Sequence, residues 1–79
     1  MVNAYDELLD FVTSGPTLEQ IVEFQHSSQT LERVHYLNWL HEHQQESPED
    51  REELREFHKA AYFIEQLKIR AKRRLGISA

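Results

Sequence analysis

The chain has 79 residues, no cysteine, nine basic and fourteen acidic side chains, and a formal net charge of −5. This length fits one domain with a thin core, and the lack of cysteine excludes disulfides and cysteine-based zinc sites. No apolar run approaches the ~20 residues of a membrane span, and the N-terminus is acidic, unlike a signal peptide. We therefore expect a cytoplasmic protein without a membrane partner, and its acidity favours basic partners over nucleic acid.

The first two expected elements are short helices. One covers about 4–13, where apolar residues recur at helical spacing, and Pro16 follows its end. The next covers about 17–25 and begins with Thr17 and Gln20 at the spacing of a capping box. The two glycines and two prolines of the chain stand at breaks, and runs typical of strands are absent from the sequence. The fold class is therefore expected to be all-α.

The third and fourth expected helices are longer, at about 29–45 and 48–75. The third carries apolar residues around most of its circumference, namely Leu31, Val34, Tyr36, Leu37, Trp39 and Leu40. Such a helix usually packs against more than one element, here other helices or a second subunit. The fourth has a Ser-Pro start and a Gly stop. Its expected core stripe is Leu54, Phe57, Ala61, Ile64, Ala71 and Leu75.

The short turn between these two helices predicts an antiparallel helical hairpin. We expect one small helical bundle over 1–79, with the two short N-terminal helices packed on that hairpin.

Charge is distributed unevenly along the fourth helix. Residues 1–67 hold all fourteen acids and four basic residues, a balance of −10. The remaining five basic residues are Lys68, Arg70, Lys72, Arg73 and Arg74. Acids at a helix start and bases at its end are what the helix dipole favours. The same five residues are also the candidate phosphate contacts of a nucleic-acid-binding regulator, which is our alternative hypothesis.

The sequence offers no metal site, cofactor site or catalytic motif that we would assign. His41 and His43 lie two residues apart, so they point to opposite sides of a helix, and His58 would need a ligand from the neighbouring helix. The carboxylates between 46 and 56 are typical of a solvent-exposed helix start, and they can attract a basic partner. We predict that the protein is not an enzyme and uses no cofactor or metal.

Four aromatic residues are the candidate partner contacts. Tyr36 and Trp39 lie on the third expected helix, and Tyr62 and Phe63 on the fourth. Tyr62 and Phe63 are adjacent, hence about 100° apart on a helix, next to a stripe that already supplies Ala61 and Ile64. Because aromatic side chains are frequent anchors of protein interfaces, these four residues predict a surface for another protein or for a second copy of the chain.

Several segments together resemble a family of small helical bacterial proteins. They are YDELLDF at 5–11, GPTLEQIVEF at 15–24, QTLERV at 29–34, PE at 48–49, EEL at 52–54 and EQLKIRAK at 65–72. The family is common in cyanobacteria, largely uncharacterised, and antitoxin-like by analogy only. This chain departs from it at 41–46, where the family has a longer turn with Asn and Gly. The resemblance carries over no catalytic residues.

The function predicted from the sequence is thus a non-enzymatic protein–protein interaction module, antitoxin-like or regulatory. A nucleic-acid-binding regulator that uses the basic end of the fourth helix is the alternative.

Overall fold

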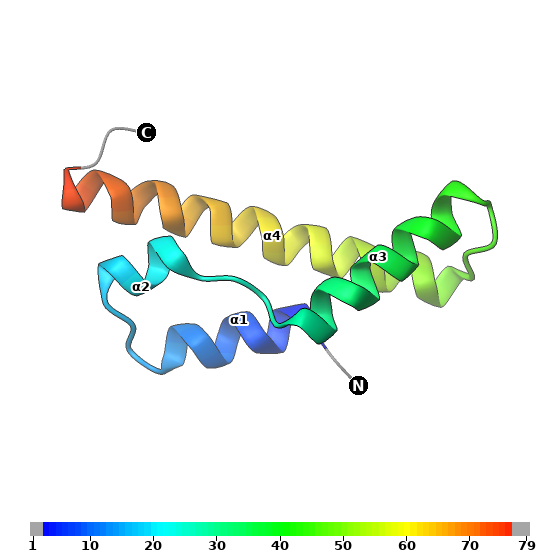
Figure 1. Ribbon diagram of the computed structural model, residues 1–79, viewed down its shortest axis with the longest axis horizontal. Helices are drawn as coiled ribbons and strands as arrows, with labels where there is room; N and C mark the ends of the chain where they lie inside the picture. The colour runs from blue at the N-terminus through cyan, green and yellow to red at the C-terminus, as the bar shows by residue number, and fades with distance from the viewer. Residues whose placement is uncertain (1–2, 77–79) are drawn as a thin grey trace.

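The computed structural model describes residues 3–76, and all the regular structure in that range is helical (Figure 1). The helices are α1 (Ala4–Thr13), α2 (Leu18–Glu23), α3 (Ser28–Glu42) and α4 (Pro48–Leu75). The all-α class is confirmed. Between residues 3 and 76, none of the helices combines the length and the apolar character that a membrane crossing requires.

The long helix α4 contacts each of the other helices. In Figure 1, α1 and α2 lie beside the C-terminal half of α4, and α3 lies beside its N-terminal half. The described chain extends 44 × 25 × 18 Å, so its longest dimension is close to the ~42 Å expected for a 28-residue helix. The shape of the molecule is therefore set by α4.

Polar caps fix where the helices begin. The side-chain oxygen of Asn3 accepts hydrogen bonds from the backbone N–H groups of Tyr5 and Asp6 at the start of α1. The expected capping box of Thr17 and Gln20 is present at α2. Each of these bonds satisfies a backbone donor that a helix start leaves unpaired.

Two helices end earlier than the sequence suggested. Helix α2 stops at Glu23, because the next residue, Phe24, leaves the helical region with ψ 135°. Helix α3 stops at Glu42 rather than near 45. There Gln44 adopts a left-handed backbone with φ 57°, and the N–H of Gln45 donates to the carbonyl of Leu40 at 2.8 Å. This is the Schellman end of a helix, and it was missed because glycine usually marks that position.

The core consists of two separate clusters along α4. In the first, Leu8 of α1 packs with Ala60 and Ile64 of α4. In the second, Leu37 and Leu40 of α3 pack with Leu54 of α4. Each cluster buries only three residues, so the stability of this small fold depends on few side chains.

Three of the six residues of the expected core stripe of α4 are buried, namely Leu54, Ile64 and Ala71. Ala60 is fully buried, whereas Ala61 is half-buried. Phe57 and Leu75 are also only half-buried. The small side chain of Ala60 lets α1 approach α4 closely, and this contact sets the rotation of α4 about its axis.

Leu8 and Leu9 provide a matched test of the first cluster. Leu8 is 1% exposed and Leu9 is 50% exposed. We expect Leu8→Ala to lower the free energy of unfolding by about 2–5 kcal/mol, because it leaves a cavity between α1 and α4. The control Leu9→Ala should change it by less than about 0.5 kcal/mol. Urea denaturation followed by circular dichroism measures both, and equal losses would contradict this account of the core.

Gln44 provides a test of the α3 end. Its left-handed backbone costs roughly 1 kcal/mol for a residue with a Cβ atom and nothing for glycine. We expect Gln44→Gly to raise the free energy of unfolding by about 0.5–1 kcal/mol. The control Gln45→Gly, one residue later, should not stabilise the protein; a gain equal to that of Gln44→Gly would refute the strain argument.

Candidate functional site

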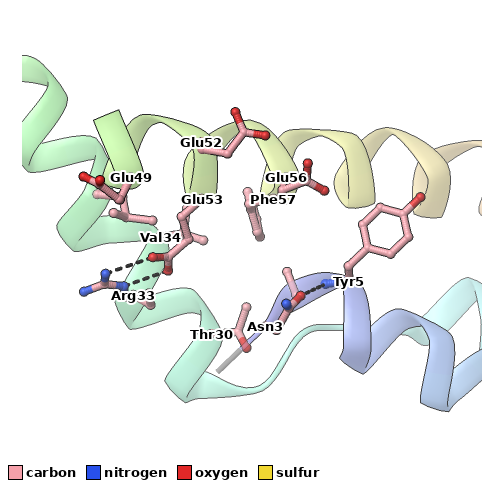
Figure 2. A pocket seen from close by; sticks show the side chains of 12 residues that line it. Asn3, Tyr5, Thr30, Arg33, Val34, Glu49, Glu52, Glu53, Glu56 and Phe57 are labelled. Carbon is pink, nitrogen blue, oxygen red and sulfur yellow. Dashed lines mark hydrogen bonds and ion pairs between the residues drawn. The ribbon is translucent and has the colours of Figure 1, made fainter. Parts of the chain in front are cut away.

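A cleft opens where the starts of α1 and α3 meet the first half of α4 (Figure 2). Its volume is about 300 Å³. Its apolar floor is formed by Ala4, Tyr5, Val34, Leu37 and Phe57. Its charged lining is formed by Glu49, Glu52, Glu53 and Glu56 with Arg33. We call it the acidic cleft, since four carboxylates and one guanidinium give it a formal charge of −3.

Arg33 of α3 forms a bidentate ion pair with Glu53 of α4. Its Nε donates to Oε2 of Glu53 at 2.8 Å, and its Nη2 donates to Oε1 of the same carboxylate at 2.9 Å (Figure 2). Asp50 lies 3.8 Å from the guanidinium. The hydrogen bond to Glu53 is the main reason that the pKa of Arg33 is raised, with partial burial opposing it. The two hydrogen bonds therefore hold a single positive charge in one position within an acidic region.

Arg33 was not among the site residues predicted from the sequence. A signal was present, because Arg33 is the only basic residue among residues 1–50. A single arginine on a helix that faces an acidic segment indicates a specific ion pair. The sequence alone does not show which carboxylate pairs with Arg33, because the start of α4 carries several of them.

The other carboxylates of the cleft are less tightly engaged. Glu52 pairs with Arg55 at 3.1 Å and Glu56 with Lys59 at 3.3 Å, both one turn apart on the exposed side of α4. Exposed ion pairs of this kind contribute little to stability, so their carboxylates can change partners readily. Glu49 makes no ion pair within the described part of the chain. A cationic group that entered the cleft would therefore find acceptors that are open to it.

A second, more open hollow runs between α1 and α3, with a volume of about 930 Å³. We call it the α1–α3 groove. It meets the acidic cleft at Asn3 and Arg33, which line both. Its acidic residues are Asp6, Glu7, Asp10 and Glu32. The two hollows therefore form one continuous acidic surface around the start of α3, interrupted by Arg33 alone.

Tyr36 and Trp39 lie on α3, and Tyr36 borders this surface. Tyr36 lines the α1–α3 groove and is 50% exposed, and Trp39 is 46% exposed one turn further on. The guanidinium carbon of Arg33 lies 5.5 Å from the centre of the Tyr36 ring. Trp39 stacks on His43 with ring centres 4.2 Å apart. Both aromatic side chains are thus exposed and held in place by neighbours.

Tyr62 and Phe63 belong to a different surface. They are 70% and 48% exposed and lie on α4. Tyr62 is two residues from each of the buried Ala60 and Ile64, which places it on the opposite side of the helix. Tyr36 and Trp39 turn about 100° and 160° away from Leu37, the residue by which α3 packs on α4. The four predicted partner contacts are therefore all exposed, but the structure does not bring them together.

The basic residues near the end of α4 do not form one stripe. Arg70, Arg73 and Arg74 are exposed, while Lys68 and Lys72 are half-buried. At 100° per residue these five side chains are spread around most of the helix. In residues 3–76, none of them takes part in an ion pair.

The histidines are also dispersed. Among residues 3–76, no three His, Asp or Glu side chains are placed to share a metal ion. His41 instead pairs with Glu46 at 2.9 Å, and His58 is exposed on α4. His26 is largely buried; its Nδ1 lies 3.0 Å from Glu7, and its Nε2 has no hydrogen-bond partner in the described structure.

Glu7 ties α1 to the start of α3. Its carboxylate accepts from the backbone N–H of Ser27 at 3.1 Å and from the Ser27 hydroxyl. Partial burial acts to raise the pKa of Glu7, but the hydrogen bonds from Ser27, His26 and Thr30 outweigh it and hold the pKa below its ordinary value. The ionised form of Glu7 is therefore favoured by folding.

This lowered pKa predicts how stability depends on pH. A carboxylate whose pKa is lower when folded stabilises the protein above its ordinary pKa, and this stabilisation is lost as the pH falls through the folded value. We expect Glu7→Gln to lower the free energy of unfolding by about 1 kcal/mol at pH 7. The difference from the wild type should shrink from about pH 5 downward.

Denaturation at a series of pH values measures the effect. The control Glu19→Gln, on the exposed side of α2, removes a charge without these bonds and should leave stability near that of the wild type. A Glu7→Gln difference that stays constant down to pH 3 would disprove the link between Glu7 and acid stability.

Comparisons with protein-family models, curated proteins and solved structures gave no match to this chain. The resemblance to the cyanobacterial family therefore remains a prediction. What the site can do follows from its own residues: it offers fixed aromatic rings, an apolar floor and an excess of carboxylates.

Proposed function

We propose that this chain is a non-enzymatic protein-interaction module, built as two short helices on an antiparallel helical hairpin, that binds a basic segment of a partner protein. The observation that carries the proposal is the position of Tyr36 and Trp39. Both are half-exposed, and each contacts a neighbouring side chain; Tyr36 lines the acidic α1–α3 groove, and Trp39 lies one turn further along α3.

The acidic surface supplies attraction and orientation. The α1–α3 groove is lined by four carboxylates and by Arg33, which is already engaged with Glu53. Such an arrangement raises the local concentration of a basic partner and speeds its encounter. Because the groove is open, this attraction is screened by salt, with a Debye length of about 8 Å at 0.15 M.

Tyr36 and Trp39 supply contact area. A large aromatic ring gains most when it is covered by a partner and when little conformational freedom is lost on binding. The contacts to Arg33 and His43 already restrict the two rings in the free chain. A partner can therefore bury the surface of these two rings with little loss of side-chain conformational entropy.

The acidic cleft suits a single cationic side chain of that partner. A lysine or arginine has a long apolar stem and a charged end. Its stem can lie on Val34 and Phe57 while its charge faces Glu49 and Glu56. The depth of the cleft then selects a basic residue at one position of the bound segment.

This binding mode is consistent with an antitoxin-like or regulatory role. A module that covers a basic segment blocks whatever that segment would otherwise contact. The resemblance to the cyanobacterial family supports this role by analogy only.

The alternative is a nucleic-acid-binding regulator that uses the basic end of α4. It is favoured by one observation: between Asn3 and Gly76, no carboxylate is paired with Lys68, Arg70, Lys72, Arg73 or Arg74. Their spread around the helix and the charge of the rest of the chain oppose it.

Calorimetric titration distinguishes the two proposals. The probes are a 12-residue peptide of alternating arginine and leucine, its glutamate counterpart, and a 20-nucleotide RNA. We expect the arginine peptide to bind, and the double variant Tyr36→Ala/Trp39→Ala to weaken its affinity at least ~10-fold, which corresponds to about 1.4 kcal/mol. Raising the NaCl concentration from 20 mM to 0.5 M should also weaken it.

The matched control is His35→Ala/Asn38→Ala, which removes two exposed side chains from the same helix. It should bind the peptide as the wild type does. Equal binding of the arginine and glutamate peptides, or no effect of Tyr36→Ala/Trp39→Ala, would rule out the proposed surface. RNA binding that is lost in Arg70→Gln/Arg73→Gln/Arg74→Gln would favour the alternative.

A further inference from the structure

Charged residues on one side of α4 are arranged symmetrically about Phe63. Two acids precede Phe63 by 11 and 7 residues, at Glu52 and Glu56, and two bases follow it by 7 and 11 residues, at Arg70 and Arg74. Seven residues make two helical turns and eleven make three, each to within about 20°. All five side chains therefore lie on one line along the helix, which we call the α4 stripe.

The stripe is accessible. Phe63 is 48% exposed, and Glu52, Arg70 and Arg74 are exposed. Glu56 is half-buried and lines the acidic cleft, and Figure 2 shows the carboxylate of Glu52 on the side of α4 away from α1. In the chain itself, the two acids make only exposed one-turn pairs, and the two arginines make no ion pair in residues 3–76. The chain thus leaves opposite charges at the two ends of the stripe without strong partners.

We propose that a second copy of this chain packs on the α4 stripe, with the two α4 helices antiparallel and a twofold axis at Phe63. Rotation about that axis places Phe63 against its own copy. It places Glu56 against Arg70 of the second copy and Glu52 against Arg74, and it repeats both pairs on the other side. A twofold interface must be self-complementary, and a symmetric acid–Phe–base order meets this condition.

Helix geometry sets the form of the dimer. The charged residues lie about 10 and 16 Å from the axis at 1.5 Å per residue. Two helices that cross at about 20° stay in contact over that length, whereas a crossing near 50° would separate the charged ends. Antiparallel helices also place opposite dipole ends together. Tyr62, exposed beside Phe63, and Leu67, half-buried one turn later, add apolar contact near the axis.

The stripe shares Glu52 and Glu56 with the acidic cleft, whereas Phe63, Arg70 and Arg74 line neither the cleft nor the α1–α3 groove. Variants of Phe63, Arg70 and Arg74 therefore test dimer formation separately from peptide binding, which Tyr36→Ala/Trp39→Ala tests. In the dimer, Phe63 supplies the apolar centre and the charges fix the direction and register of pairing.

A charge-swap experiment tests the dimer. The acidic variant is Arg70→Glu/Arg74→Glu, and the basic variant is Glu52→Arg/Glu56→Arg. Each alone brings like charges together in the proposed dimer, so we expect each to self-associate at least ~10-fold more weakly than the wild type in sedimentation equilibrium. When mixed, each acidic end faces a basic end, and a heterodimer of wild-type affinity should form.

Phe63→Asp should abolish association both in the wild type and in the mixture, because it places two carboxylates at the axis. The control Glu19→Arg/Glu23→Arg makes the same charge change as the basic variant, on exposed positions of α2, and should associate as the wild type does. Circular dichroism verifies that each variant is helical. A wild type that stays monomeric to 1 mM at low salt, or a mixture that forms no heterodimer, would overturn the proposal.

Discussion

Helices α1, α2 and α3 bury their apolar faces on the single long helix α4, because between Asn3 and Gly76 no two of the three form a core without it. Each of α1, α2 and α3 packs on α4, and two small clusters around Leu8 and Leu37 make the buried core. A chain of this length cannot cover all its apolar side chains by itself. The exposure of Tyr36, Trp39, Tyr62 and Phe63 follows from that limit, and it gives the molecule two surfaces that are suited to partners.

Electrostatics gives the two surfaces different characters. Around the start of α3, carboxylates from α1, α3 and α4 converge while Arg33 is the one guanidinium among them. On the α4 stripe, the two acids precede Phe63 and the two bases follow it at equal spacings, an order that the helix dipole also favours. We propose that the first arrangement binds a basic segment of another protein and that the second binds a copy of the same helix. In both proposals the aromatic side chains provide the buried contact area, and the charges determine the orientation of the bound partner.

The sequence was sufficient for the class of fold and for the helix starts. Caps such as Asn3 and Thr17 act within three residues, so a sequence shows them directly. The end of α3 was missed because a glutamine occupies a backbone position that glycine usually takes. Ala60 was missed because Ala60 and Ala61 are identical neighbours in the sequence, and only the contact with Leu8 decides which of the two is buried.

The candidate site could be predicted only in part. The exposed aromatic residues were found from the excess of apolar side chains on α3 and α4. The acidic cleft and the α1–α3 groove were not found, because they are made by residues from three helices whose relative positions depend on tertiary packing. The pairing of Arg33 with Glu53, twenty residues later, has the same origin.

We propose that a basic partner binds to the acidic surface around the start of α3 and to Tyr36 and Trp39 in the second half of that helix. Nuclear magnetic resonance titration of the isotope-labelled chain with the arginine–leucine peptide tests this proposal, since every backbone amide and the indole of Trp39 report separately. We expect the largest chemical-shift changes at Asp6, Asp10, Glu32, Tyr36 and Trp39. Shifts that are confined to the C-terminal half of α4, or spread evenly over the chain, would contradict it.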